Sequence, residues 1–180
     1  MNMKKTFLAT ICLFAGMSIY AQQIDVQPVP QKVIPATQTI KLTGTYLLNG
    51  INDANPFAAE ALKTILGTSE SMKGGMKVFI GERGDKAVSK YKKFIPAQAE
   101  GYFVRISPKE IVLAGYDERG TYYAVQTFRQ LIENGQVPVT EITDWPDIRF
   151  RGVVEGFYGT PWSHEARLRH LKFYGQNKMN

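Results

Sequence analysis

Short stretches of alternating apolar and polar residues, rich in Val, Ile, Leu and Thr, predict a series of strands. The stretches are bounded by Gly, Pro, Asn or Ser, and they cover residues 37–42, 45–48, 76–80, 101–106, 110–114 and 137–142. Ser107-Pro108-Lys109 separates the fourth stretch from the fifth, which predicts a hairpin with proline in its turn. Residues 22–35 carry three prolines and are expected to form an extended entry rather than a helix.

Apolar residues spaced three or four positions apart predict two helices between these strands. The first follows Asn55 as its N-cap, has Pro56 at its first position and ends at Gly67. The second covers residues 119–133, and its apolar stripe consists of Tyr122, Val125, Phe128, Leu131 and Ile132. Residues 85–94 are charged and predict a further short helix.

This order of elements predicts a small α+β domain, with an antiparallel sheet and helices on one face, at residues 22–145. The pattern changes after Pro146: residues 148–155 predict a strand, residues 156–159 a turn, and Ser163 the N-cap of another helix. A single strand–loop–helix unit cannot cover both faces of its strand, and parallel sheets need further crossovers. Residues 146–180 are therefore expected to be the truncated start of a (β/α)8 barrel.

Residues 1–21 have the pattern of a secretory signal peptide. Two lysines precede an apolar run over residues 7–19, which is shorter than the roughly 20 residues that a membrane-spanning helix needs. We expect cleavage after Ala21, export to the periplasm or the extracellular space, and no stable membrane insertion of the mature chain, which would begin at Gln22. An amphipathic or buried N-terminal helix is the alternative interpretation.

The composition is typical of a folded globular protein, with 44% hydrophobic and 21% charged residues. The net charge is +6, and subtracting the two lysines of the predicted signal leaves +4, with one basic cluster at residues 90–93. This weak concentration of charge argues against a nucleic acid partner. The single cysteine, Cys12, lies in the signal, and His164 and His170 are the only histidines. We therefore expect no disulfide, no thiol chemistry, no metal centre and no cofactor.

The sequence contains no glycine-rich phosphate loop, no HExxH and no GxSxG motif. Glu155 ends the predicted strand 148–155, and the carboxyl ends of the strands are where (β/α)8 barrels build their active sites. One carboxylate supplies no acid–base pair. We favour a buried carboxylate paired to Arg149, to Arg151 or to loop amides, and a catalytic acid is the alternative.

Two segments resemble known enzymes. Residues 151–162, Arg-Gly-Val-Val-Glu-Gly-Phe-Tyr-Gly-Thr-Pro-Trp, closely resemble the first barrel strand and following loop of glycoside hydrolase family 84, the retaining β-N-acetylglucosaminidases. Residues 117–128 resemble a helix of the small α+β domain that precedes the barrel in family 84 and in the hexosaminidases of family 20. The resemblance covers essentially the whole mature chain. It implies the N-terminal part of an exported exo-acting enzyme whose substrates are N-acetylglucosamine-containing glycans or glycoconjugates.

The resemblance also implies substrate-assisted hydrolysis, in which the 2-acetamido oxygen attacks C1 while two Asp residues orient the acetamide and protonate the leaving oxygen. In the family this Asp pair follows a later strand, and no such pair ends a predicted strand here, so we expect these 180 residues to be inactive. The resemblance assigns sugar contacts to the Gly156 backbone and to Phe157 and Tyr158 as pocket walls. A glycine needed only for a tight turn is the alternative role for Gly156.

Two other functions stay open at this point. The small domain could be a non-catalytic carbohydrate- or protein-binding module, which predicts exposed aromatic rings at Tyr102, Tyr116 or Tyr122. The chain could instead be a structural spacer, which predicts no concave surface at the Gly156 loop.

Overall fold

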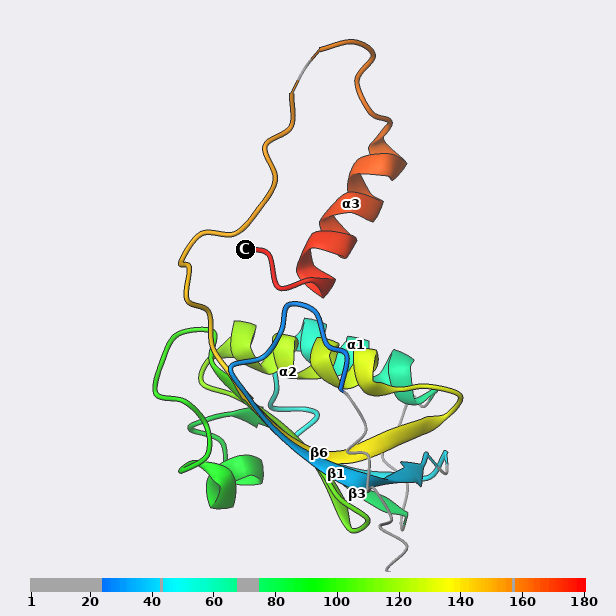
Figure 1. Cartoon of the computed structure of the whole chain (residues 1–180), viewed down its shortest axis with the longest axis vertical. Coiled ribbons are helices and arrows are strands. Elements are labelled where there is room, and N and C mark those ends of the chain that lie inside the picture. Colours follow the sequence, from blue (N-terminus) through cyan, green and yellow to red (C-terminus); the bar gives the residue numbers. More distant parts are fainter. Residues whose placement is uncertain (1–23, 43, 68–74, 157) are drawn as a thin grey trace, which may run out of the picture.

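The computed structural model describes residues 24–42, 44–67, 75–156 and 158–180. They form a small domain built on a sheet, and a C-terminal unit that projects from it (Figure 1). The predicted signal at residues 1–21 lies outside the described residues. Within the described residues, every helix is too short or too polar to span a membrane.

The sheet that the described residues form has six strands in the order β1-β6-β4-β5-β3-β2. The strands are β1 (Lys32–Lys41), β2 (Tyr46–Asn49), β3 (Met76–Glu82), β4 (Tyr102–Ile106), β5 (Glu110–Gly115) and β6 (Gln136–Asp144). β1 pairs with β6, β6 with β4, and β4 with β5, in each case antiparallel. β4 and β5 form the predicted hairpin, in which the Ser107 amide donates to the Glu110 carbonyl at 3.0 Å.

The prediction of an antiparallel sheet is wrong at the other edge, where β5, β3 and β2 run parallel to one another. The chain leaves β2, passes through helix α1 (Pro56–Leu66) and enters β3 from the same end of the sheet. A helical crossover of this kind requires parallel neighbours, whereas a short turn produces antiparallel ones. The sheet is therefore mixed.

Helices α1 and α2 (Glu118–Leu131) cover the same face of the sheet (Figure 1). The caps of α1 are as predicted: Asn55 Oδ1 accepts from the amides of Phe57 and Ala58 at 2.9 and 3.2 Å, and Gly67 closes the helix with φ 63°. Glycine suits that position because a left-handed backbone conformation is unfavourable for residues with a Cβ.

The predicted helix at residues 85–94 is a shorter 3₁₀-helix, η1 (Lys86–Tyr91), and it lies on the opposite face of the sheet. Successive side chains along β4 point to opposite faces of the sheet. Tyr102 and Val104 pack in the main core beneath α1 and α2, whereas Phe103 packs in the smaller cluster around η1, which includes Tyr91. The central strands are thus buried on both faces, and helices lie on both.

The C-terminal unit consists of an extended segment, a loop and helix α3 (His164–Gln176). Ser163 caps α3 as predicted, because its Oγ accepts from the Ala166 amide at 3.2 Å. Residues 148–155, however, form no strand, since residues 148–149 lie in a bend and residues 150–155 have no regular secondary structure, so that prediction is wrong for this structure. A strand exists through its hydrogen bonds to a neighbouring strand, and the described residues supply none here. The start of a barrel stays a prediction.

Candidate functional site

The loop after residue 155 surrounds a hollow of about 300 Å³. Its lining residues are Val154, Glu155, Gly156, Tyr158, Gly159, Thr160, Pro161 and Trp162. The loop lies at the end of the C-terminal unit that is farthest from the sheet (Figure 1). A concave surface at this position is what a spacer would lack, so the structure argues against a purely structural role.

Gly156 has room for a side chain in this structure. A Cβ placed on it would stand 3.5 Å from Cδ2 of Tyr158, an ordinary van der Waals contact, and its φ is not in the left-handed region. Gly159 is different, because its φ of 103° favours glycine. The turn therefore requires a glycine at position 159 and not at position 156. The alternative role of Gly156, a glycine needed only for a tight turn, has no support in this structure.

The predicted walls of the pocket are Phe157 and Tyr158. Tyr158 lines the hollow with a side chain that is 101% exposed, so no residue that the structure describes covers its ring. Phe157 falls outside the described residues. The sugar contacts assigned to residues 156–158 stay predictions.

Glu155 is neither buried nor paired as we predicted. Its Oε1 accepts from Nη2 of Arg167 in α3 at 3.0 Å, and its side chain is 34% exposed. Arg151 is directed to Glu100 instead, and the guanidinium of Arg149 lies over the ring of Phe150. The prediction failed because α3 returns beside the extended segment and brings an arginine distant in sequence next to this carboxylate.

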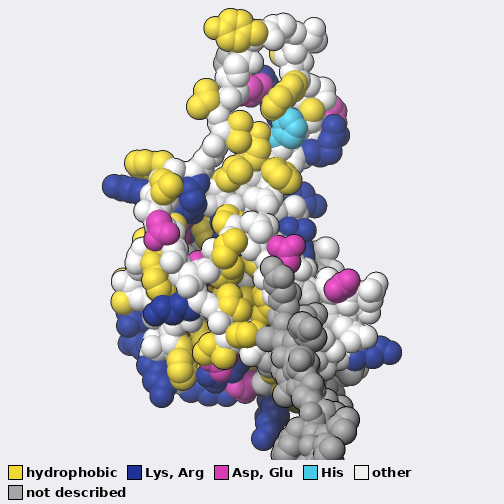
Figure 2. All heavy atoms as spheres, viewed as in Figure 1, with side chains coloured by type: hydrophobic (Ala, Val, Ile, Leu, Met, Phe, Trp, Pro, Cys, Tyr) yellow, Lys and Arg dark blue, Asp and Glu magenta, His cyan; other side chains and the backbone are white. Residues whose placement is uncertain are grey.

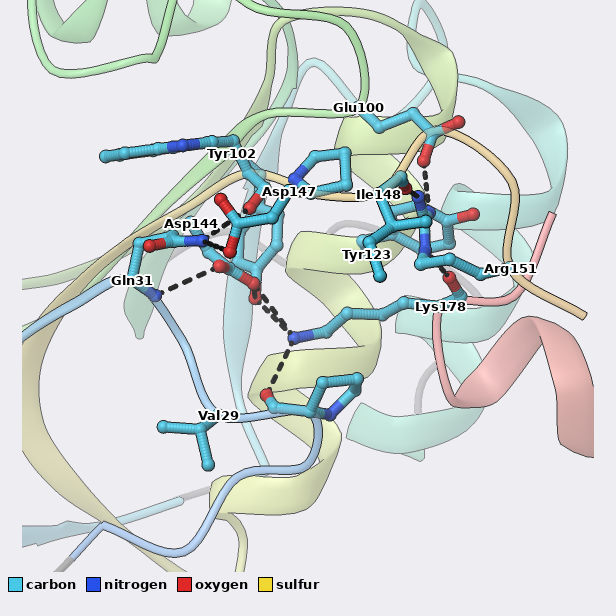
Figure 3. Close-up of a pocket in the computed structure, with 13 residues that line it drawn as sticks. Val29, Gln31, Glu100, Tyr102, Tyr123, Asp144, Asp147, Ile148, Arg151 and Lys178 are labelled. Carbon is cyan, nitrogen blue, oxygen red and sulfur yellow. Dashed lines mark hydrogen bonds and ion pairs between the residues drawn. The ribbon is translucent and has the colours of Figure 1, made fainter.

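A buried ion cluster joins the last residues of the chain to the sheet (Figure 3). Lys178 Nζ donates to Asp144 Oδ2 at 3.1 Å, to the Tyr102 hydroxyl at 2.7 Å and to the Pro28 carbonyl at 3.5 Å. The Tyr102 hydroxyl donates in turn to Asp144 Oδ2 at 2.7 Å and lies 2.7 Å from the Thr127 hydroxyl. All three hydrogens of the Lys178 ammonium thus have acceptors, which leaves none for a ligand.

Burial shifts the titration of this cluster. It lowers the pKa of Lys178, because a low-dielectric environment disfavours the charged form, while Asp144 acts in the opposite direction. Burial and then the charge of Asp144 raise the pKa of Tyr102 well above its usual range, so the phenol stays protonated. The ordinary chemical role of such a cluster is structural.

A second ion cluster centres on Glu100, whose carboxylate bonds to Nη2 of Arg151. Arg119 Nη1 lies 3.2 Å from Glu100 Oε1, and Asn180 Nδ2 donates to the same oxygen at 2.7 Å. Burial alone would raise the pKa of Glu100, but the hydrogen bonds from Arg151 and Asn180 outweigh it and hold that pKa below its ordinary value. Figure 3 shows Arg151 directed at Glu100, apart from the Asp144 group.

Sequence reasoning missed both clusters. It singled out neither Glu100 nor Lys178, and it considered Arg151 only as a partner for Glu155. The residues that flank a buried, paired charge in the sequence do not differ from those that flank a solvent-exposed charge. The local sequence therefore carried no signal for either cluster. The one indirect hint was Asp144, an acidic residue close after the predicted strand 137–142.

The adjacent carboxylates Asp117 and Glu118 serve the start of α2. Asp117 Oδ1 accepts from the Gly120 amide at 2.8 Å, and its Oδ2 accepts from the Glu100 amide at 2.9 Å. Across the residues that the structure describes, no three His, Cys, Asp or Glu side chains gather into a group that could hold a metal ion.

The tyrosines that would mark a binding module are mostly covered. Tyr102 is 1% exposed and Tyr122 is half-buried against the core, whereas Tyr116 is 38% exposed beneath the guanidinium of Arg83. One exposed ring does not form an aromatic platform, so this observation counts against the binding-module alternative.

Two family matches cover most of the chain. Residues 23–145 match glycosyl hydrolase family 20, domain 2, and residues 151–180 match the β-N-acetylglucosaminidase family. These matches confirm the resemblance drawn from residues 117–128 and 151–162.

Solved structures show the same fold. CpGH84B is 30% identical, with a TM-score of 0.78 over 88% of this chain and 29% of its own. CpGH84D is 21% identical, with a TM-score of 0.75 over 88% of this chain and 30% of its own. The β-N-acetylhexosaminidase from Bacteroides fragilis NCTC 9343 is 22% identical, with a TM-score of 0.66 over 86% of this chain and 31% of its own. The chain thus spans less than a third of the length of these proteins.

Proposed function

Since this chain belongs to the glycosyl hydrolase family 20 domain 2 family through residues 23–145, we propose that it is the N-terminal portion of an exported, retaining β-N-acetylglucosaminidase. The observation that carries this proposal is the match of residues 151–180 to the β-N-acetylglucosaminidase family. That segment contains the Gly156 loop and its hollow. The substrates are glycans or glycoconjugates that end in N-acetyl-β-glucosamine.

The proposed mechanism uses the substrate's own acetamide oxygen as the nucleophile. An enzyme nucleophile is then unnecessary, and two adjacent carboxylates divide the remaining work between acetamide orientation and protonation of the leaving oxygen. The sequence has one pair of adjacent acidic residues, Asp117 and Glu118, and it opens helix α2 in the small domain. We therefore place the catalytic Asp pair outside these 180 residues and propose that the chain alone is inactive.

Gly156 takes a binding role in this proposal. It directs only backbone atoms at the hollow, so a sugar ring could approach the chain more closely than any side chain would permit. A carbonyl or amide at that point can bond to a sugar hydroxyl but can donate no proton to a leaving group. The proposal also assigns contacts with the sugar to Phe157 and Tyr158.

Hydrolysis of an aryl N-acetyl-β-glucosaminide tests the proposal. The 180-residue chain should release no product and the protein extended beyond residue 180 should do so, because acid–base assistance alone contributes about 10²–10⁴ in rate. In the extended protein, Gly156→Val should abolish turnover with the fold intact. Gly84→Val is the matched control, since that glycine is exposed, has open space around it and is remote from the loop.

Two results would contradict this assignment. Turnover by the 180-residue chain that Glu155→Gln abolishes would show that the catalytic carboxylate lies in the present segment. Unchanged kinetics of Gly156→Val in the extended protein would remove that glycine from the site.

A further inference from the structure

We infer that one buried and one partly buried ion pair form a clamp that sets the position of residues 148–180 on the small domain, and with it the position of the Gly156 loop. The clamp consists of Asp144 with Lys178 and Glu100 with Arg151. In each pair the acid belongs to the small domain and the base to the C-terminal part of the chain. Arg151 and Lys178 are accordingly positioning residues and not catalytic ones.

The Asp144–Lys178 pair has the geometry that a buried pair needs. Lys178 is 5% exposed and Asp144 is 7% exposed, and every hydrogen of the ammonium is directed at an acceptor. A buried pair with all its hydrogen bonds made tolerates little displacement, because moving one partner leaves the other charge buried and unpaired. The pair therefore favours one placement of Lys178 strongly over others.

The guanidinium of Arg151 is bonded on each of its nitrogens. Nη2 bonds to Glu100, Nε donates to the Lys178 carbonyl at 2.8 Å, and Nη1 donates to the Ile148 carbonyl at 2.7 Å. The bond to the Lys178 carbonyl connects the two ion pairs. A planar guanidinium fixes orientation as well as distance, so Arg151 determines the direction in which the chain leaves the small domain.

One residue of each pair has a left-handed backbone: φ is 62° at Glu100 and 60° at Lys178. At Lys178 this conformation belongs to the end of α3, where the Lys178 amide donates to the Gly175 carbonyl at 3.2 Å and the Met179 amide to the Tyr174 carbonyl at 3.0 Å, the Schellman pattern of a helix C-terminus. At Glu100 the backbone amide donates to Asp117 Oδ2 at 2.9 Å. The backbone at each pair is thus held by hydrogen bonds of its own, which limits where the two charged side chains can lie.

Hydrophobic packing does not explain the placement of the C-terminal unit. Helix α3 has no buried residue, and apolar side chains of the unit remain at the surface, among them Val153 at 55% and Val154 at 96% exposure. Figure 2 shows hydrophobic side chains on the visible face of this unit. The junction also contains a hydrogen bond from the Tyr123 hydroxyl to the Met179 carbonyl at 3.3 Å. The two ion pairs connect the unit to the small domain through side chains that are buried or largely buried.

The clamp also closes the two ends of the unit on each other. The Asn180 amide donates to the Arg151 carbonyl at 2.8 Å, and the Arg151 amide donates to Asn180 Oδ1 at 3.0 Å. The chain between them therefore leaves and returns at a single point. A change in the clamp then moves the whole unit, including the loop at its far end (Figure 1).

The clamp does not depend on the proposed hydrolysis; only its consequence for sugar binding does. A distance measurement on the 180-residue chain consequently tests it without any activity assay. Spin labels on Lys86→Cys in η1 and Leu168→Cys in α3 report on the small domain and the C-terminal unit, since both positions are exposed. Cys12→Ser removes the native thiol, and double electron–electron resonance measures the distance between the labels.

The labelled parent should give one narrow distance distribution. Lys178→Met and Arg151→Met should each broaden it about twofold or more, because the unit then samples several orientations. Two matched controls should leave the distribution narrow: Lys172→Met, an exposed lysine of α3, and Arg149→Met, an exposed arginine two positions from Arg151. Slow amide exchange in α2 must be retained, which shows that the small domain is folded.

An unchanged narrow distribution in both clamp variants would overturn the inference. If Lys178→Met unfolds the small domain, the double variant Asp144→Asn/Lys178→Met replaces it, because that protein has no charge left unpaired in the cluster. A narrow distribution in this double variant and in Arg151→Met would equally overturn it. If both clamp variants broaden the distance distribution but the extended enzyme is inactive, the clamp is supported and the proposed function is rejected.

Discussion

Tyr102→Phe is the substitution for which the structure gives the most defined expectation. The ring is 1% exposed and packs in the main core, so the phenylalanine ring can occupy the same volume. What is lost is one hydroxyl with three hydrogen-bond partners: the Asp144 carboxylate, the Lys178 ammonium and the Thr127 hydroxyl. The perturbation therefore isolates hydrogen bonding from packing.

The magnitude follows from the charges of those partners. A hydrogen bond to a charged group contributes about 1.5–3 kcal/mol to stability, and a neutral one contributes about 0.5–1.5 kcal/mol. The three bonds share one hydroxyl and belong to one network, so they do not add fully. We expect Tyr102→Phe to lower the free energy of unfolding by about 3 kcal/mol, which is a large part of the roughly 5–15 kcal/mol typical of a domain.

Urea denaturation followed by far-UV circular dichroism measures this loss. With a slope of about 2 kcal/mol per molar urea, the midpoint should fall by about 1.5 M. Tyr46→Phe is the matched control, because that ring is also buried, at 2% exposure, and its hydroxyl accepts one bond at 3.3 Å, from the neutral Gly44 amide. Its expected cost is about 1 kcal/mol or less.

The comparison decides whether the charged network matters. A midpoint for Tyr102→Phe no lower than that of Tyr46→Phe would refute the reasoning, since the charged partners would then contribute nothing beyond an ordinary hydroxyl contact. A further test combines Tyr102→Phe with Lys178→Met. The double variant should lose less stability than the two single variants lose in sum, because each single substitution already disrupts the same hydrogen-bond network.

Three further predictions concern folding, pH and export. Residues 22–143 should fold alone, and amides of residues 153–154 should exchange faster than those of residues 125–128 in α2; equal protection of the two segments would contradict this. The pKa of Glu100 is lowered in the folded state, so its contribution to stability is present above its unfolded pKa of about 4.3 and is lost as pH falls through the lower folded value. Urea midpoints at pH 3 and 6 should therefore differ less in Glu100→Gln than in the parent. N-terminal sequencing of exported protein should begin at Gln22, and an intact N-terminus on soluble cytoplasmic protein would exclude the signal.

Much of the local structure was predictable from the sequence because its causes are local. A side chain that caps a helix lies within three residues of the amide it accepts from, so Asn55 and Ser163 could be identified by position alone. The six strands of the small domain follow from runs of β-branched and apolar residues, and the β4–β5 turn from Pro108. The Gly156 loop was recognisable because its motif is contiguous.

Strand direction and strand existence were decided by the tertiary structure. Alternation of side chains is the same in a parallel and an antiparallel strand, so the pattern could not show that β2, β3 and β5 run parallel. Residues 148–155 have the composition of a strand, but a strand needs a hydrogen-bonded neighbour, which no local pattern provides.

The two ion pairs of the clamp depended entirely on the tertiary structure. Lys178 lies 34 positions from Asp144 and 76 from Tyr102, and Arg151 lies 51 positions from Glu100. In the sequence each of these residues resembles a solvated surface charge, because burial and pairing depend on which distant segments the fold brings together. The sequence by itself determined the elements, their caps and the loop motif, whereas the electrostatic contacts that place the loop arose only when the sheet and the C-terminal residues packed together.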